Sequence, residues 1–141
     1  MPKLQVSTIS RATRLLCASL PLSLLAVSGH AADWSQAQKI TVVMVDNRFQ
    51  PDHVSFDQGE TYDLHLENHG KDMHEFTAPA FLKAATIRDE KLLANGGTDI
   101  VIQPGQTVDI FLVAPAKGQY SLVCADHDWD GMTGSITVGG K

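Results

Sequence analysis

Three residues near the C-terminus could together hold a metal ion. Cys124, His127 and Met132 follow the spacing Cys-x2-His-x4-Met and offer a thiol, an imidazole and a thioether. Thiolate and thioether sulfur favour Cu(I), and imidazole suits both oxidation states of copper. Structural zinc sites use more thiolates or imidazoles and no methionine, and iron–sulfur clusters need several cysteines. The donor set therefore indicates copper.

A trigonal copper site with one thiolate, two imidazoles and a long axial methionine needs a second histidine from elsewhere in the chain. We select His74, which opens an extended segment directly after the polar turn 68–72. A loop at one end of a β-sandwich can face a later loop at the same end, so the two segments could converge. His53, His65 and His69 are interpreted as exposed surface residues, the ordinary situation for polar side chains.

The N-terminus is predicted to be a secretory signal. Residues 1–14 contain three basic residues and no acidic one, residues 15–29 are largely apolar, and Gly29 and Ala31 are small residues at the positions that a signal peptidase reads. We expect cleavage after Ala31, which gives a signal peptide over 1–31 and a mature domain over 32–141 in the periplasm. No segment reaches the roughly 18 continuous apolar residues that a membrane span needs.

Cysteine usage and strand parity bear on Cys124. The chain has two cysteines, and Cys17 would leave with the signal, so the mature protein would keep one thiol that is free, intermolecular or a ligand. Period-two alternation puts Cys124 on the same strand face as Tyr120 and Leu122. Taken alone, that position suits a small buried side chain. The imidazole and thioether that follow it favour a ligand.

Composition excludes several classes of protein. The chain has 141 residues, of which 43% are hydrophobic and 19% charged, as in a globular protein of one domain. Removal of residues 1–31 takes away three of the 11 basic residues and none of the 16 acidic ones, so the formal net charge changes from −5 to −8. A mature chain this acidic is not expected to bind nucleic acid.

From residue 40 onward, the sequence predicts one strand after another. Residues 82–97 are the exception, because they lack period-two alternation and could hold a helical turn. About eight short strands separated by turn signals predict an all-β protein, an antiparallel β-sandwich. The predicted strands cover residues 40–49, 54–59, 61–70, 74–81, 98–105, 107–115, 118–126 and 132–138.

These features together resemble the cupredoxin family of type 1 (blue) copper proteins, which includes plastocyanin, pseudoazurin and azurin. The resemblance rests on the Cys-x2-His-x4-Met loop, on the upstream histidine and on the pattern Gly134-x-Ile136-x-Val138 after the loop, and it covers about residues 40–138. It implies an eight-stranded Greek-key sandwich with one copper near one end.

The resemblance also implies a role for each ligand. His74, Cys124 and His127 would be the equatorial ligands, and Met132 would be the axial one. Many members have asparagine directly after the first histidine ligand, where it helps to tie the two ligand loops together. This chain has Glu75 there, so we expect a different support for the site, and such support tunes a metal centre.

The predicted ligand loop is unusually acidic. Asp126 and Asp128 flank His127, and Asp130 is close by, whereas plastocyanin-like members tend to have an apolar rim. Trp129 supplies the one large apolar side chain of the loop. Two roles remain possible for Trp129: it could pack beneath the loop, or it could be exposed and dock a partner.

The preferred functional hypothesis is an exported one-electron carrier with one type 1 copper that cycles between Cu(I) and Cu(II). Its partner would be a small redox protein such as a c-type cytochrome, or a respiratory enzyme, with a basic docking surface. The alternative is periplasmic copper homeostasis or resistance, with Met44 and Met73 as extra soft ligands, although core filling is favoured for both. An enzyme is not expected, because copper oxidases need further histidine-rich sites and the chain has no His-x-His pair.

Overall fold

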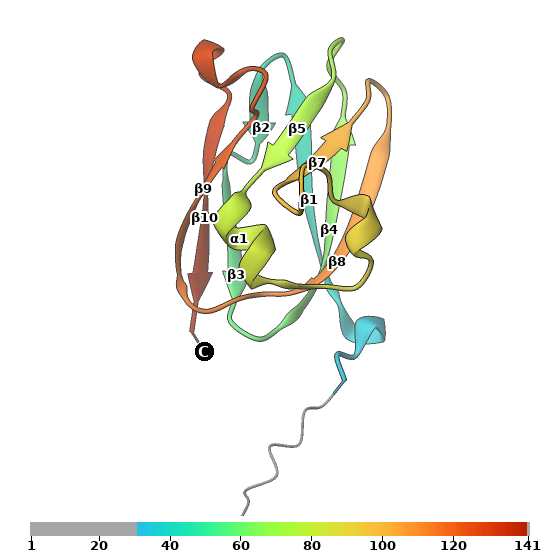
Figure 1. Ribbon diagram of the computed structural model, residues 1–141, viewed down its shortest axis with the longest axis vertical. Helices are drawn as coiled ribbons and strands as arrows, with labels where there is room; N and C mark the ends of the chain where they lie inside the picture. The colour runs from blue at the N-terminus through green and yellow to red at the C-terminus, as the bar shows by residue number, and fades with distance from the viewer. Residues whose placement is uncertain (1–30, 141) are drawn as a thin grey trace, which may run out of the picture. The chain divides into compact units, whose positions relative to one another are not determined.

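The computed structural model describes residues 31–140 (Figure 1). Residues 1–30 of the expected signal peptide lie outside this range, so the expected cleavage stays a prediction. In the described range, ten strands form two five-stranded sheets. The first sheet has the order β2-β1-β4-β8-β6, with β1 at Gln38–Val45, β2 at Arg48–Gln50, β4 at Thr61–Asn68, β6 at Thr86–Ile87 and β8 at Thr107–Val113.

The second sheet has the order β3-β10-β9-β5-β7. Its strands are β3 at His53–Asp57, β5 at His74–Thr77, β7 at Asp99–Ile102, β9 at Gly118–Val123 and β10 at Thr133–Gly139. The short helix η1 at Trp34–Gln36 precedes β1. Further short helices lie between strands, namely α1 at Pro79–Ala84, η2 at Glu90–Leu92 and η3 at Asp128–Asp130. Buried side chains from both sheets form a single hydrophobic core, which confirms the all-β sandwich.

The sheets are mixed rather than purely antiparallel. β1 pairs with β4 in parallel, and β3 pairs with β10 in parallel. The cause is a change of sheet, because the chain places β3 in the second sheet before β4 returns to the first. A strand that returns after such a crossover can run in the same direction as its neighbour.

The predicted strand 40–49 is a hairpin. β1 ends at Val45, which pairs with Arg48 of β2 across a two-residue turn. The turn residues, Asp46 and Asn47, have positive φ values of 42° and 62°. Positive φ at both central residues is the requirement of a type I′ hairpin turn, and Asp and Asn tolerate it better than most residues. The Asp-Asn dipeptide was therefore the turn signal inside the predicted strand.

The segment 74–81, predicted to be extended, changes to a helix partway. β5 ends at Thr77, and α1 begins at Pro79. Proline is well suited to the first helical position, because its fixed φ matches the helix and its missing N–H would have no partner there. The helix buries Phe81 and Leu82 against the core.

Pairing of β5 with β9 determines where the predicted ligands meet. The two strands are antiparallel and pair at Thr77 and Val123. The start of β5, which is His74, therefore lies toward the same end of the sandwich as the segment after β9, which begins at Cys124 (Figure 1).

Candidate metal centre

The structure brings together three of the four predicted ligands by their donor atoms. The Cys124 Sγ atom lies 3.4 Å from His127 Nδ1 and 4.0 Å from His74 Nδ1. The two imidazole rings have centroids 4.9 Å apart. Donor atoms of these three residues all lie within 4.8 Å of one another, as needed to contact one ion.

Burial differs among the four residues. His74, Cys124 and Met132 are buried, and His127 is half-buried at the surface of the site. The parity argument for β9 is confirmed, because Leu122 and Cys124 both face the core. Water is thus excluded from the thiol, while one imidazole edge stays near the surface.

Backbone hydrogen bonds close the loop that carries Cys124, His127 and Met132. The Cys124 N–H donates to the Met132 carbonyl at 3.0 Å, the Met132 N–H donates to the His127 carbonyl at 3.1 Å, and the His127 N–H donates to the Cys124 carbonyl at 3.0 Å. Gly131 ends η3 with φ of 84°, a left-handed conformation that glycine adopts without steric cost. The three residues are therefore fixed relative to one another by the main chain.

The turn before His74 depends on two residues that sequence reasoning missed. The buried Asn68 side chain donates to the carbonyls of Asp72 at 2.9 Å and Ile102 at 2.8 Å, and it accepts from the Gly70 N–H at 2.9 Å. A Cβ atom on Gly70 would lie 2.8 Å from His74 Nε2, so only glycine leaves room for the imidazole. An asparagine and a glycine in a turn gave no sequence signal of this role, because it depends on contacts distant in sequence.

Burial favours the uncharged forms of both Cys124 and His74. It is the main cause that raises the pKa of the Cys124 thiol, while N–H groups of the backbone, including that of Glu75 at 3.3 Å, act in the opposite direction. It is also the main cause that lowers the pKa of His74, and the nearby His127 adds to this effect. A neutral imidazole is the form that binds metals, and a cation would favour the thiolate.

Glu75, the departure from the family pattern, belongs to β5 and contacts the cysteine loop. Its side chain is buried, and burial is the main cause that raises its pKa, followed by the carboxylates of Asp126 and Asp99. A hydrogen bond from the backbone of Ala125 acts in the opposite direction. Through its N–H to Cys124 Sγ and its carboxyl to Ala125, Glu75 joins the β5 segment to the cysteine loop.

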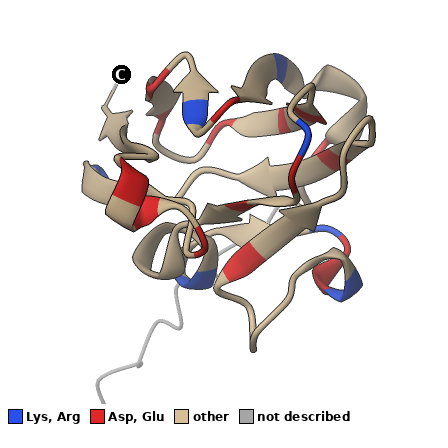
Figure 2. Cartoon of the chain, turned by 90° about the horizontal axis from the view of Figure 1, so that it is seen from above, with Lys and Arg blue, Asp and Glu red and all other residues tan. Residues whose placement is uncertain are grey.

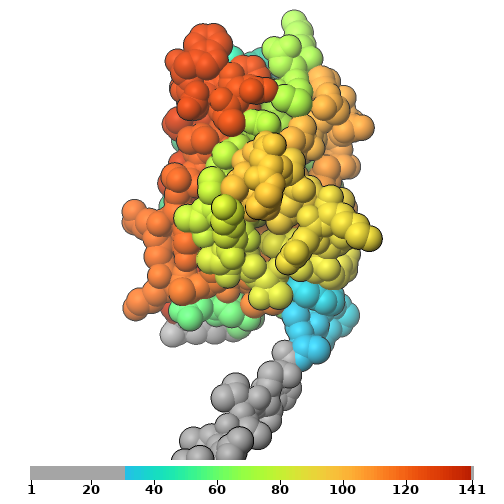
Figure 3. Space-filling view, viewed as in Figure 1, coloured from blue at the N-terminus to red at the C-terminus, as the bar shows by residue number. Residues whose placement is uncertain are grey.

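Trp129 is exposed. Its side chain is 79% accessible, and its indole N–H donates to the Asp126 carbonyl at 2.9 Å. Packing beneath the loop is therefore excluded. Figure 3 shows the loop, in red-orange, at one end of the sandwich, and Figure 2 views the chain from this end, with Asp and Glu in red.

Comparison with known proteins gives the family. A model of the cupredoxin-like domain matches residues 17–138, most of the chain, so the protein belongs to the cupredoxin-like family. No curated protein matches in sequence. This match confirms the family resemblance that the sequence predicts.

Solved structures with the same fold include two auracyanins. Auracyanin B is 19% identical, with 73% of this chain and 89% of that chain covered and a TM-score of 0.56. Dithionite-reduced auracyanin from the photosynthetic bacterium Roseiflexus castenholzii is 19% identical, with 77% and 99% covered and a TM-score of 0.55. A multicopper oxidase from Campylobacter jejuni is 13% identical, with 79% of this chain but 31% of that chain covered and a TM-score of 0.55. At these identities the likeness concerns the fold.

The residues of the site fit the cofactor that the family implies. One thiol and two imidazoles converge, and the fully buried Met132 ends the same loop. A thiolate with two imidazoles and a weak thioether ligand suits one type 1 copper, and the set lacks the additional thiolates or imidazoles of structural zinc sites.

Proposed function

We propose that the protein carries single electrons by means of one type 1 copper. The ligands would be the four predicted residues, His74, Cys124, His127 and Met132. The observation that carries this proposal is the convergence of one buried thiol with two imidazoles at one end of the sandwich. Bound copper would supply a one-electron step between Cu(I) and Cu(II).

Three features of the chain support a carrier over a protein that hands copper on. The ligand loop is closed by main-chain hydrogen bonds, and the turn before His74 is held by the buried Asn68, so the donors should move little when the charge of the site changes. Cys124 has no exposed surface, which hinders ligand exchange. Met44 lies in the hydrophobic core, which supports core filling rather than copper handling.

His127 is the expected exit for the electron. It is the half-buried ligand, and the exposed Trp129 and the carboxylates of Asp126 and Asp128 surround it in sequence. We infer that the partner is a small redox protein such as a c-type cytochrome, or a respiratory enzyme, with a basic surface. Such a surface would be steered by the acidic rim, which Asp126, Asp128 and Asp130 form, and its cationic side chains could stack on the Trp129 indole.

We also propose export to the periplasm and a role without catalysis. Among the described residues, no helix is long and apolar enough to cross a membrane. Mass spectrometry of a periplasmic fraction should find a chain that starts at Ala32. Recovery of soluble native protein that still begins at Met1 would contradict export.

The function is tested by two measurements on the copper-loaded mature protein. Optical and EPR spectra should show an intense visible band from thiolate-to-Cu(II) charge transfer. Stopped-flow mixing with a c-type cytochrome should show fast, reversible electron transfer, while Cu(I) transfer to a chelator should be slow. Sluggish redox cycling together with ready loss of Cu(I) would instead favour copper homeostasis.

A further inference from the structure

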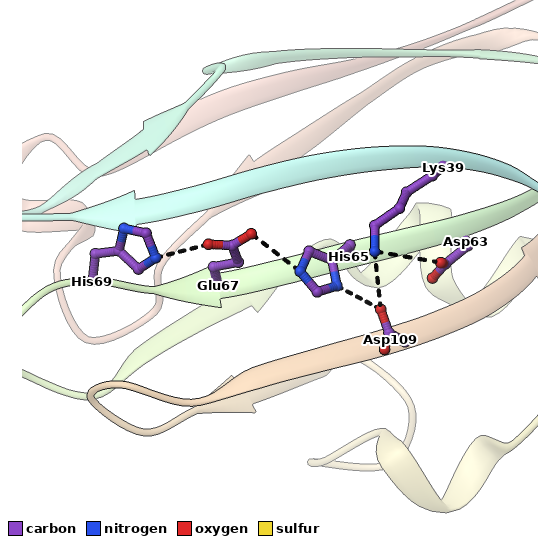
Figure 4. A network of polar contacts seen from close by, with 6 residues as sticks. All are labelled: Lys39, Asp63, His65, Glu67, His69 and Asp109. Atoms are coloured by element: carbon purple, nitrogen blue, oxygen red, sulfur yellow. Dashed lines mark hydrogen bonds and ion pairs between the residues drawn. The ribbon is translucent and has the colours of Figure 1, made fainter.

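A second group of polar side chains lies on the outer face of the first sheet. His65, Glu67 and His69 follow the spacing His-x-Glu-x-His along and just beyond β4, and a strand directs every second side chain to the same face. Asp109 of β8 is the direct cross-strand partner of His65. Figure 4 shows these residues in one continuous chain of contacts with Lys39 and Asp63. The proposed copper centre uses none of them.

The His65 imidazole lies between two carboxylates, those of Asp109 and Glu67. Its Nδ1 atom lies 2.5 Å from an Asp109 oxygen, and its Nε2 atom lies 3.1 Å from a Glu67 oxygen. A carboxylate only accepts, so the Nδ1 atom must carry the proton donated to Asp109. A neutral His65 then presents a lone pair on Nε2 to a second carboxylate. Two acceptors at this distance need a positive species between them, either another proton or a metal ion.

We propose that His65, Glu67 and His69 form a surface site for a divalent ion of the Zn²⁺ or Cu²⁺ kind, separate from the copper centre. Imidazole and carboxylate donors suit both ions. The Nε2–Oε1 separation of 3.1 Å in the His65–Glu67 pair is close to that of adjacent ligands on an ion about 2.0–2.2 Å from each.

The surroundings of His65 support a ligand role. Histidines that bind metals commonly donate their other ring N–H to a carboxylate, which orients the ring and raises its basicity. Asp109 makes this contact, and the hydrogen bond from His65 is the main cause that lowers the pKa of Asp109. The His65 ring is therefore held with Nε2 directed at Glu67.

His69 would complete the site by a rotation of its side chain. Its Nε2 atom lies 2.7 Å from the second oxygen of Glu67, so Glu67 separates the two imidazoles at present. The His69 side chain is 58% exposed, whereas that of His65 is 16% exposed. The proposal is thus a preformed His65–Glu67 pair with the exposed His69 as the third ligand.

Charge balance also favours a cation. Asp63, Glu67 and Asp109 bring three carboxyl groups to this face, and Lys39 lies 3.9 Å from Asp63 and 4.0 Å from Asp109. In the described part of the chain, Glu67 forms its ion pairs with His65 and His69. A divalent ion would offset the negative charge at the Glu67 end of the network.

The test uses the mature protein loaded with Cu(I), so that added zinc meets a filled copper centre. Calorimetric titration with Zn²⁺ should show one further equivalent per chain. His65→Gln and, separately, Glu67→Gln should each weaken zinc binding by at least about 10-fold, and Asp109→Asn should weaken it by about 10- to 100-fold. The matched control is His53→Gln, which removes an exposed histidine from β3 and should leave the binding unchanged.

Folding of each variant is checked by the visible band of its Cu(II) form, which should be unaltered. Imidazole ¹⁵N NMR should show the His65 and His69 resonances shift with zinc. Absence of a second equivalent, or equal zinc binding by wild type and His65→Gln, would overturn the proposal. So would a His65 ring that holds protons on both nitrogens near neutral pH and does not respond to zinc, because a proton would then be the positive species.

Discussion

His74 and His65 are strand residues with opposite surroundings. His74 faces the core, where a thiol and a second imidazole meet it, and burial lowers its pKa. His65 faces outward between the carboxylates of Asp109 and Glu67. The same side chain thus lies in a buried, sulfur-containing cluster on one sheet and in an outward-facing, carboxylate-rich network on the other. The difference teaches that the neighbours of a histidine, more than its strand position, determine which ions it can bind.

The largest expected effect is on the visible band, which should depend on the cluster around Cys124 and not on the network around His65. Cys124→Ser should abolish the intense visible band, because a hydroxyl does not give thiolate-to-Cu(II) charge transfer. His65→Gln should leave that band unchanged. Optical and EPR spectra of the Cu(II)-loaded variants provide the measurement. A weak d–d band in the wild type, or an altered band in His65→Gln, would break the distinction.

Gly70→Ala should damage the buried cluster by crowding. The new Cβ atom would meet His74 Nε2 at 2.8 Å, and the imidazole has little space to move because it is 1% exposed. Overpacking of this kind costs about 1–3 kcal/mol of unfolding free energy. Urea denaturation of the copper-free protein measures it. Gly139→Ala is the control, since its Cβ would make an ordinary 3.6 Å contact with Asp57; an equal loss in both would contradict the argument.

Glu75→Gln should raise the reduction potential. The substitution keeps the shape and the N–H contact to Cys124 but removes the negative charge of the ionised carboxyl. That charge favours Cu(II) over Cu(I), so its removal favours Cu(I) and raises the potential. A buried charge on the residue next to a ligand is worth on the order of 1 kcal/mol, or roughly 50 mV for one electron. Cyclic voltammetry at neutral pH measures the shift. Asp99→Asn, which removes a buried carboxyl opposite Thr77 on the neighbouring strand, should give a smaller rise.

The acidic rim should have a weaker effect, because its carboxylates are exposed. Asp126→Asn with Asp128→Asn should raise the potential slightly and slow the reaction with a cationic partner by about 2- to 10-fold at low salt. Stopped-flow rates at several ionic strengths measure this. Asp89→Asn with Glu90→Gln removes the same charge at η2 and should change the rate less. Equal rates for the wild type and both double variants would show that the acidic rim does not take part in docking.

The smallest expected effect concerns acid stability of the outer network. The hydrogen bond from His65 lowers the pKa of Asp109, so its ionised form stabilises the fold above the ordinary pKa of the group, and this is lost as the pH falls through the lowered value. Burial raises the pKa of Asp63, so its ionisation has the opposite sign. Asp109→Asn should destabilise the neutral protein by less than about 1 kcal/mol, as for surface pairs. Asp63→Asn should not destabilise the neutral protein. Thermal melts of both variants from pH 3 to pH 7 provide the comparison.

The side of the sheet to which Cys124 points could be predicted, because strand parity is a local property. Tyr62, Leu64 and Leu66 alternate with polar residues and are buried, as such alternation predicts for a half-buried strand, and Cys124 is buried directly after the end of β9. The choice of His74 as the partner of Cys124 needed only the idea that two loops at one end can meet. His53 and His69 are exposed as predicted, while His65 points outward but is largely covered by its neighbours.

The remaining features depend on contacts that no local pattern encodes. The hairpin turn at Asp46 and Asn47 lies within a segment of residues that favour strands, so the sequence predicted one continuous strand there. The roles of Asn68 and Gly70 come from the carbonyl of Ile102 and the ring of His74, which the fold brings to them. Exposure of Trp129 likewise depended on the shape of the loop, which the sequence left open.

The hydrogen bond between the Cys124 N–H and the Met132 carbonyl has a consequence for evolution. It continues the β9–β10 ladder by one rung beyond the pair Val123–Thr133, so residues 125–131 form the tip of a hairpin whose stem is already in register. Insertions or deletions within the tip would leave the stem paired and the sandwich intact. Natural variation can therefore change the spacing of the ligands, and with it the properties of the metal, as an exchangeable module on an unchanged scaffold.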